Sequence, residues 1–280
     1  LAPKPIFSKV GGFYNANQDI TLSTTIPGAV IRYTTDGSEP TESSPIYTGK
    51  ITASKRSEVS YRWGYDAKNK TQVQQYSWAE GYGNINSSYY TSMFKDPVSK
   101  AFVLKAKVFH DDYVPSVTAC QTYFINMNRP SLPVVSLVTD KANFFNADSG
   151  IYIQGINGCY RGVNGDVLAN WNQDWERKVY VEYYDATGTR QFGVNAGAST
   201  MGAVSRQIDL KSLNIVMRSE YEPGAIEYPM FGDDGNSVYE SFLLRNSGND
   251  WEQGVFARDA MIQSIVRGQS DMETQDYQPV

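Results

Sequence analysis

Histidine and cysteine are scarce in this sequence, and their scarcity excludes several kinds of site. The 280 residues contain a single histidine, His110, and two cysteines, Cys120 and Cys159. A zinc site built on several histidines is therefore excluded, and any Ser-His-Asp triad would have to use His110. Without a Cys-x-x-Cys spacing we expect buried free thiols. The cluster His110-Asp111-Asp112 lies between two expected strands, so we interpret it as a polar turn rather than a metal site.

Runs of positive charge and long apolar runs are also lacking. The formal net charge is -5 and no lysine- or arginine-rich run occurs, which argues against a general nucleic-acid partner because such proteins need a concentrated basic surface. No apolar run approaches the roughly 20 residues of a membrane-spanning helix. The chain begins with Leu1 rather than Met, so we expect a processed or recombinant chain from which any signal peptide has been removed.

Residues 1–127 are predicted to form an immunoglobulin- or fibronectin-like β-sandwich. Short segments alternate between apolar and polar residues and are separated by turn residues. Strands are expected at Val30–Thr34 and Phe102–Val108, and Asp36-Gly37 with Pro40 supplies a turn and a stop after the first of them. No stretch of this half has helical periodicity over a useful length. The whole chain is therefore expected to be β-rich.

A resemblance to a known module becomes visible in three segments of this half. They are Tyr33-Thr-Thr-Asp-Gly-Ser-Glu-Pro-Thr41, Pro45-Ile-Tyr47 and Val103-Leu-Lys-Ala-Lys107. Together they resemble the small Fn3-associated or chitobiase C-terminal-like sandwich found on secreted bacterial proteins, over about residues 5–54 and 101–125. The resemblance implies an accessory or spacer role rather than a catalytic one.

Residues 55–100 interrupt that pattern and are predicted to be an aromatic-rich insertion. Tyr61, Trp63 and Tyr65 would share one face of a strand, and Trp78 follows. Exposed rings of this kind can stack on sugars, so Trp63 and Trp78 are candidate glycan-binding residues. The alternative is that the rings pack the insertion onto the sandwich, because buried aromatic side chains are the commoner case.

A domain boundary is expected at Asn126–Pro133, where two prolines stiffen the chain, and residues 128–280 are predicted to form an α+β domain. Strands are expected at Val134–Val138, Ile151–Ile153, Trp175–Tyr184, within Arg206–Tyr221 and at Ser241–Arg245, with a small flexible segment at Gly197–Gly202. The glycines between residues 154 and 174 match neither a P-loop nor a Rossmann fingerprint, so we expect a surface loop there. One packed helix is expected after a cap at Asp250, with apolar residues Ala257, Met261 and Ile265 on one face and an end at Gly268.

Lys211 is the most informative charged residue of this domain. Alternation places it on the same face of a strand as Leu213, Ile215 and Met217. A lysine in line with a buried row must find a partner or extend its stem to the rim of the core. The pattern therefore leaves two interpretations open: a snorkelling lysine at a strand end, or a lysine held in a cleft for an anionic ligand such as a nucleotide phosphate.

A series of blocks resembles the N-terminal part of the CotH-type atypical protein kinases, a family first named from spore-coat proteins. The blocks are Pro133–Asp140, Ser149–Tyr152, Trp175–Glu182, Arg206–Ile215, Leu243–Asp250 and Arg258–Met261, within about residues 130–280. The resemblance implies a kinase-like N-lobe that binds ATP with Mg²⁺. It implies that Lys211 contacts the nucleotide phosphates.

Two further residues become candidates in that setting. Arg206, five residues before Lys211, is a candidate second phosphate contact, since guanidinium groups bind phosphate oxygens bidentately. A kinase lysine is usually fixed by a helix carboxylate, and Asp259 is the candidate, with Glu252 as the alternative. An ordinary helix-surface charge is the competing interpretation of Asp259.

The carboxylates that hold Mg²⁺ and orient the acceptor hydroxyl are missing from this stretch. In the family they come from a C-terminal lobe, whereas this sequence stops at Val280, and Asp271, Glu273 and Asp276 have no kinase-like context. We expect this stretch alone to be inactive, and the intact protein to phosphorylate extracellular or envelope proteins with ATP from a secreted or cell-surface location. The alternative is a non-enzymatic surface module for adhesion or glycan binding. A glycosidase ranks last, because no carboxylate pair can be placed at the required separation from sequence.

Overall fold

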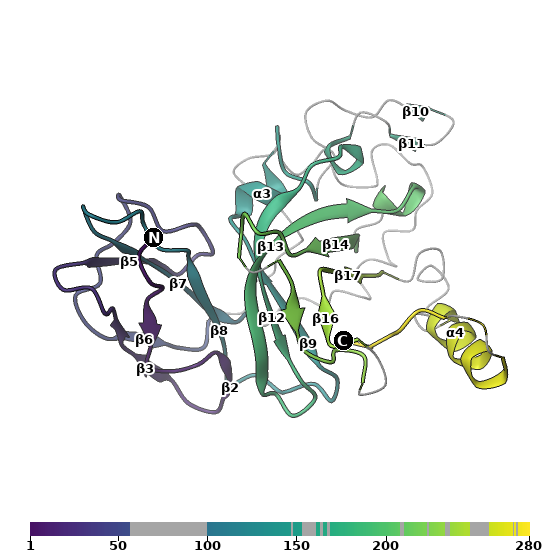
Figure 1. Cartoon of the computed structure of the whole chain (residues 1–280), viewed down its shortest axis with the longest axis horizontal. Helices are drawn as coiled ribbons and strands as arrows, with labels where there is room; N and C mark the ends of the chain where they lie inside the picture. Colours follow the sequence, from purple (N-terminus) through teal and green to yellow (C-terminus); the bar gives the residue numbers. More distant parts are fainter. Residues whose placement is uncertain are drawn as a thin grey trace.

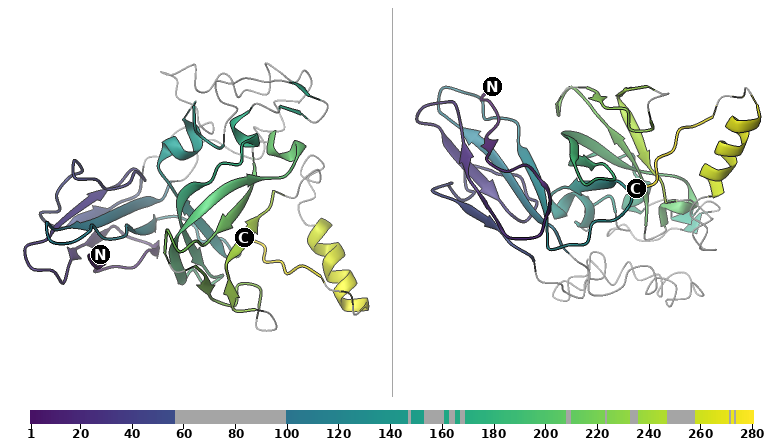
Figure 2. Two further views of the ribbon diagram at one scale, coloured as in Figure 1. Left: turned by 45° about the horizontal axis from the view of Figure 1, so that its top comes forward. Right: turned by 90° about the horizontal axis from the view of Figure 1, so that it is seen from below.

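The protein consists of two bodies of β-structure that lie side by side, with helix α4 projecting from the second body (Figures 1 and 2). The structure is a computed structural model. It describes residues 1–56, 100–146, 148–152, 161–162, 165–166, 169–207, 210–222, 224–232, 236–246, 258–270, 272 and 274–280. The predicted aromatic insertion with Trp63 and Trp78, and also Cys159, Asp250 and Glu252, lie outside these residues.

The first body combines a four-stranded sheet, in the order β2-β8-β7-β5, with the two-stranded sheets β1-β4 and β3-β6. Its strands are β1 (Ile6–Phe7), β2 (Gly12–Tyr14), β3 (Gln18–Ile20), β4 (Leu22–Ser23), β5 (Val30–Thr34), β6 (Ile51–Ala53), β7 (Phe102–Phe109) and β8 (Ala119–Ile125). Alternation along β7 turns Leu104, Ala106 and Val108 inward, where they share one core with Ile20 and Tyr123. The small sheets and the large one are therefore held together by a common apolar layer.

The second body is built on a five-stranded antiparallel sheet in the order β17-β14-β13-β12-β9. Its strands are β9 (Val134–Val138), β12 (Arg177–Tyr184), β13 (Arg190–Met201), β14 (Ser212–Val216) and β17 (Ser241–Leu244). Around it lie the hairpin strands β10 (Arg161–Gly162), β11 (Gly165–Asp166), β15 (Ile226–Glu227) and β16 (Val238–Tyr239), the helices α3 (Lys141–Phe145) and α4 (Arg258–Gln269), and the 3-10 helices η2 (Asn170–Asn172) and η3 (Val204–Gln207). Within the described part of the chain, no helix has both the length and the apolar character needed to cross a membrane.

The two faces of this sheet are covered differently. On one face Val179, Val181 and Ile215 are almost fully buried and form the main core together with Phe144 of α3. On the opposite face the first body covers the side of the sheet formed by β9 and β12, where Cys120, Val138 and Tyr180 make a small apolar cluster. The β14 and β17 side of that face borders a cavity. One sheet face therefore carries both the contact between the bodies and the candidate site.

A buried ion pair lies at the centre of the contact between the two bodies. Glu182 of β12 is fully buried, and its carboxylate accepts hydrogen bonds from Arg190 Nε (2.7 Å) and from the Thr122 hydroxyl of the first body. Burial raises the pKa of Glu182, against the opposing effects of Arg190 and Thr122. Tyr184 adds a second link, because its hydroxyl donates to the Thr122 carbonyl at 3.1 Å. Polar groups at this boundary are therefore satisfied across it, which is the condition for burying them.

The acidic turn of the first body makes a further contact. Glu39 accepts hydrogen bonds from Lys105 Nζ (2.9 Å) and Thr118 Oγ1 (2.6 Å), and Lys178 Nζ of the second body lies 3.4 Å away. Lys105 is only 2% exposed, although alternation along β7 directs it away from the side that carries Leu104 and Ala106. The side of β7 that carries Lys105 is buried because the second body covers it.

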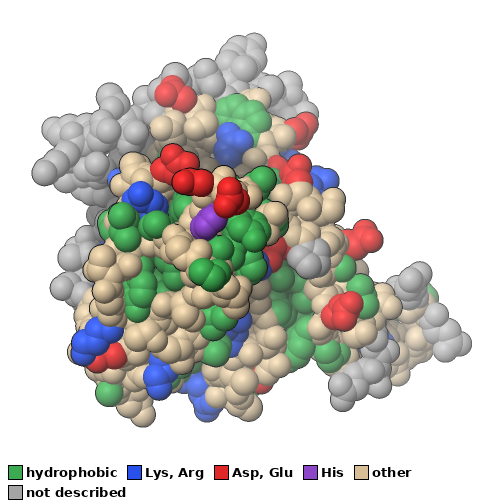
Figure 3. Space-filling model, turned by 60° about the vertical axis from the view of Figure 1, so that its left-hand side comes forward, with side chains coloured by type: hydrophobic (Ala, Val, Ile, Leu, Met, Phe, Trp, Pro, Cys, Tyr) green, Lys and Arg blue, Asp and Glu red, His purple; other side chains and the backbone are tan. Residues whose placement is uncertain are grey.

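Most elements agree with the sequence, and the β-rich class is confirmed. β5 and β9 have the predicted bounds. The expected turn after β7 is present, where Tyr113 N–H donates to the His110 carbonyl and Asp112 N–H to His110 Nδ1. Figure 3 shows this histidine at the surface among acidic side chains, and no group of three metal-binding side chains occurs in the described residues.

Three local predictions are wrong. The segment expected to be flexible continues β13 as far as Met201, because its backbone pairs with β14 throughout and with β12 at its start. Ile151 and Tyr152 form a turn hydrogen-bonded to α3 rather than a strand. The predicted packed helix is present as α4, but none of its residues is buried, and Met261 and Ile265 are at least half exposed.

Candidate functional site

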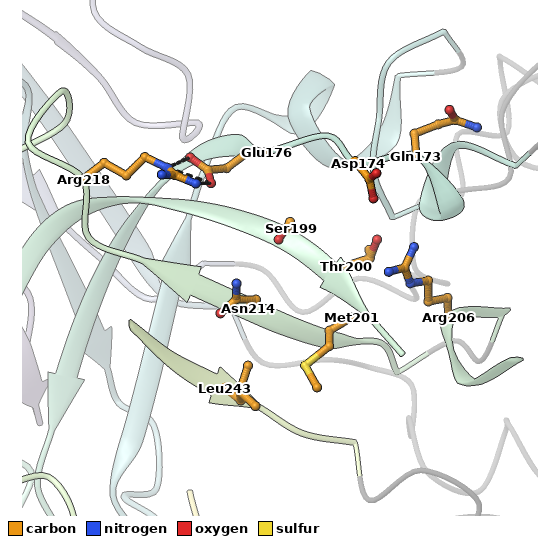
Figure 4. Close-up of a pocket in the computed structure, with 10 residues that line it drawn as sticks. All are labelled: Gln173, Asp174, Glu176, Ser199, Thr200, Met201, Arg206, Asn214, Arg218 and Leu243. Carbon is orange, nitrogen blue, oxygen red and sulfur yellow. Dashed lines mark hydrogen bonds and ion pairs between the residues drawn. The ribbon is translucent and has the colours of Figure 1, made fainter. Parts of the chain in front are cut away.

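A polar cavity of about 500 Å³ lies over the β13, β14 and β17 part of the sheet (Figure 4). Its lining residues are Gln173, Asp174, Glu176, Ser199, Thr200, Met201, Arg206, Asn214, Arg218 and Leu243. Ser199, Asn214 and Leu243 are paired across the three strands, so they present one continuous floor. Hydroxyl, amide, carboxylate and guanidinium groups therefore face the same space, as in a site for a polar ligand.

One end of the cavity is closed by an ion pair. Arg218 Nε lies 2.9 and 3.0 Å from the two carboxylate oxygens of Glu176, and Arg218 Nη2 donates to Glu176 Oε2 at 2.8 Å. The Tyr221 hydroxyl donates to the same carboxylate at 3.1 Å. The hydrogen bonds from Arg218, together with that from Tyr221, lower the pKa of Glu176 in spite of its partial burial. Glu176 is therefore a fixed anion in the cavity wall.

Arg206 and Asp174 lie at the other end of the cavity, as Figure 4 shows. Arg206 belongs to η3, and its Nε–H is buried without a hydrogen-bond acceptor among the described residues. A buried guanidinium donor without an acceptor is unfavourable, and an anionic ligand would supply the missing acceptor. Arg206, which the sequence predicted as a phosphate contact, therefore lines the cavity and has an N–H donor that a ligand could bind.

Lys211 immediately precedes β14 and is 6% exposed. Its Nζ donates to the Arg206 carbonyl at 2.7 Å and lies 4.3 Å from the centre of the Trp171 ring, within the range of a cation–π contact. Its backbone N–H donates to the Tyr152 hydroxyl at 3.0 Å. The structure therefore brings the two residues together, with the Lys211 ammonium bound to the Arg206 carbonyl. Arg206 lines the cavity, whereas Lys211 is not among the lining residues.

Asp259 lies in the first turn of α4, and its carboxylate forms an ion pair with Arg245. The contacts described for Lys211 include Arg206, Tyr152 and Trp171, and the ion pair described for Asp259 is the one with Arg245. The role of Asp259 stays a prediction, as does that of Glu252, which is outside the described residues. Cys120 is a buried free thiol as expected, and its burial raises the pKa of the thiol.

The Glu176–Arg218 pair was not predicted from the sequence, because neither residue has an unusual position in the alternation. The available signal was the second face of β14, where Asn214 stands between the buried Leu213 and Ile215. A polar face beside a buried one indicates exposure, and only the fold reveals that this exposed face is hollowed.

Comparison with known families gives one match. Residues 9–75 match the family described as the Chitobiase/beta-hexosaminidase C-terminal domain. This confirms the chitobiase-like part of the resemblance for the first body, and the match continues into the segment that was expected to be an insertion. No curated protein and no solved structure matches the chain.

Proposed function

We propose that the second body is the phosphate-binding part of a CotH-like kinase domain, and that the first body is its accessory immunoglobulin- or fibronectin-like sandwich. The family assignment of the second body rests on the sequence blocks alone. The observation that supports a phosphate site is the buried Arg206 Nε–H, which lines the cavity and lacks an acceptor in the described part of the chain. In this proposal the site holds ATP for the phosphorylation of extracellular or envelope proteins.

The residues divide between two tasks in this proposal. Arg206 binds phosphate oxygens directly, because its guanidinium faces the cavity and can offer parallel N–H donors. Lys211 holds the Arg206 carbonyl and contributes positive charge, and it reaches a phosphate itself only after its ammonium leaves that carbonyl. The described residues contain no group of three or more His, Cys, Asp or Glu side chains that could hold a metal ion, and we assign only the phosphate contacts.

Calorimetric titration of the chain with tripolyphosphate, and with ATP plus Mg²⁺, tests the phosphate site. We expect Arg206→Gln to weaken tripolyphosphate binding about tenfold or more, because a hydrogen bond to a charged group contributes about 1.5–3 kcal/mol. Arg267→Gln is the matched control, since Arg267 is an exposed arginine of α4 that pairs with Asp276 outside the cavity. Equal affinity of Arg206→Gln and the unaltered chain, or no binding by either, would count against the site.

Glycan binding is the second candidate, favoured by the mixed lining of the same cavity. Amide, hydroxyl and carboxylate groups at Asn214, Ser199 and Asp174, beside the apolar Leu243, are the groups that recognise a sugar. A glycan array probed with the unaltered chain separates the two candidates. Trp63→Ala and Trp78→Ala, which lie outside the described residues, test the aromatic insertion on the same array.

A further inference from the structure

Residues 218–222 form a turn that lies between the cavity and the first body. The backbone N–H groups of Tyr221 and Glu222 both donate to the Arg218 carbonyl, at 2.9 and 3.2 Å. Side chains of this turn extend in two directions. Arg218 and Tyr221 bind Glu176 in the cavity wall, whereas Glu222 points into the contact between the bodies.

Glu222 connects the turn to both bodies. Its Oε2 accepts hydrogen bonds from the backbone N–H of Asn195 (2.9 Å) and from Asn195 Nδ2 (3.0 Å), and its Oε1 forms an ion pair with Lys4 of the first body. Asn195 Nδ2 also donates to the Thr118 carbonyl of the first body at 3.0 Å. Asn195 is 1% exposed and the Glu222 side chain 8%, so this is a buried network in which each lost partner leaves a polar group unsatisfied.

The ion pair on the other side of the turn is more exposed to solvent. Arg218 is 53% exposed and Glu176 is 21% exposed. Solvent screening and side-chain entropy oppose an exposed pair, so the three hydrogen bonds from Arg218 to Glu176 form readily only when the turn places the arginine over the carboxylate. Glu222 helps to hold that turn through its contacts with Asn195 and Lys4.

We propose that Glu222 is a positioning residue through which the first body sets the wall of the cavity. The first body is then a structural part of the candidate site, acting through Lys4 and Thr118 on the turn that carries Arg218. Only the last step, that this wall borders a phosphate site, rests on the proposed function. The link from the first body to the wall stands on the contacts alone.

The test follows the Arg218 Nε–H signal by NMR in the whole chain. Glu222→Ala is expected to move this signal to the position of a solvent-exposed arginine and to change tripolyphosphate affinity several-fold. Glu222→Gln keeps an acceptor for Asn195 and should restore most of the signal. Lys4→Met acts from the first body alone, leaves the Asn195 contacts in place, and should produce a smaller shift of the same sign.

Lys50→Met is the matched control, because Lys50 forms an exposed ion pair with Asp19 entirely within the first body. It should leave the Arg218 signal and the affinity unchanged. An unchanged Arg218 signal in folded Glu222→Ala overturns the proposal, and so does an unchanged signal in Lys4→Met if Glu222→Ala does not fold. A shifted Arg218 signal without tripolyphosphate binding by the unaltered chain upholds the positioning role and overturns the phosphate site.

Discussion

Glu39 shows how one carboxylate can join two bodies and make their association sensitive to pH. Burial alone would raise its pKa, but the charges of Lys105 and Lys178 and the hydrogen bond from Thr118 outweigh that effect and lower the pKa from the usual 4.5 to about 2. A carboxyl with a lower pKa in the folded state stabilises the fold fully above its unfolded pKa. That contribution decreases as the pH falls from about 4.5 to about 2.

Glu39→Gln should therefore lower the free energy of unfolding at neutral pH, and the difference from the unaltered chain should shrink as the pH falls below about 4.5. Urea unfolding at a series of pH values measures this difference. Glu42→Gln is the control, since Glu42 is exposed in the same loop and has no ion pair in the described part of the chain. A difference between Glu39→Gln and the unaltered chain that stays constant with pH would contradict the charge-based account.

For individual residues, the sequence predicted burial more successfully than it predicted the partners of the buried side chains. The row Leu213, Ile215 and Met217 is buried as the alternation indicated. The burial of Lys211 also followed from its place in that row, but its contacts with the Trp171 ring and the Arg206 carbonyl did not. Alternation fixes the direction of a side chain within one strand, whereas these partners come from η2 and η3, whose positions depend on tertiary packing.

At the scale of elements, β13 is the strand on which the cavity depends. A Cβ placed on Gly197 would overlap the Glu176 side chain, so the absence of a side chain at this point allows the carboxylate to lie over the strand. The small residues that suggested a flexible segment therefore allow the Glu176 side chain to lie close to the β13 backbone. Glycine in a sheet usually indicates such an approach.

Gly197→Ala should displace Glu176 and break its pairing with Arg218. The free energy of unfolding should change by less than about 1 kcal/mol, because the overlapping atoms are in a movable side chain and alanine is favoured over glycine within a strand by about 0.5–1 kcal/mol. The Arg218 Nε–H signal and a thermal unfolding curve measure the two effects. Gly224→Ala, where the added Cβ has no neighbour closer than 4.0 Å, should change neither.

At the scale of the whole molecule, the contact between the bodies was the least predictable feature. Alternation along β7 and β12 places Lys105 and Glu182 on the faces opposite the apolar rows of their own strands. Both residues are nevertheless buried, because the outward faces of the two sheets cover one another. The apolar and polar pattern of one strand does not show whether its outward face packs against another sheet. The sequence therefore predicted the strands of each sheet but not the contact between the two sheets.

A substitution at Gly11 tests whether the two bodies unfold as one unit. An added Cβ would lie 2.7 Å from the Thr122 carbonyl oxygen and 2.7 Å from the Tyr184 hydroxyl, which come from opposite bodies. Gly11→Ala should therefore lower the free energy of unfolding by about 1–3 kcal/mol, the usual effect of overpacking a close contact. Gly12→Ala is the matched neighbour, because its Cβ would meet only the Tyr14 ring, at 3.8 Å.

Differential scanning calorimetry measures the number of unfolding transitions and their temperatures. The unaltered chain should unfold in one transition, since separating the bodies would expose the buried Glu182 carboxylate and break its hydrogen bond from Thr122 of the first body. Gly11→Ala should shift that transition to a lower temperature or divide it into two, and Gly12→Ala should leave it in place. Two transitions in the unaltered chain would show that the bodies unfold separately.

The close approach at Gly11 also constrains how this protein can be recombined. A crossover at residues 126–133 would separate Gly11 and Thr122 from Tyr184 and Glu182, although that linker is the natural place to join unrelated domains. Chimaeras that exchange only one body should fold poorly unless these contact residues are transferred together. The two bodies are therefore expected to be inherited as a pair.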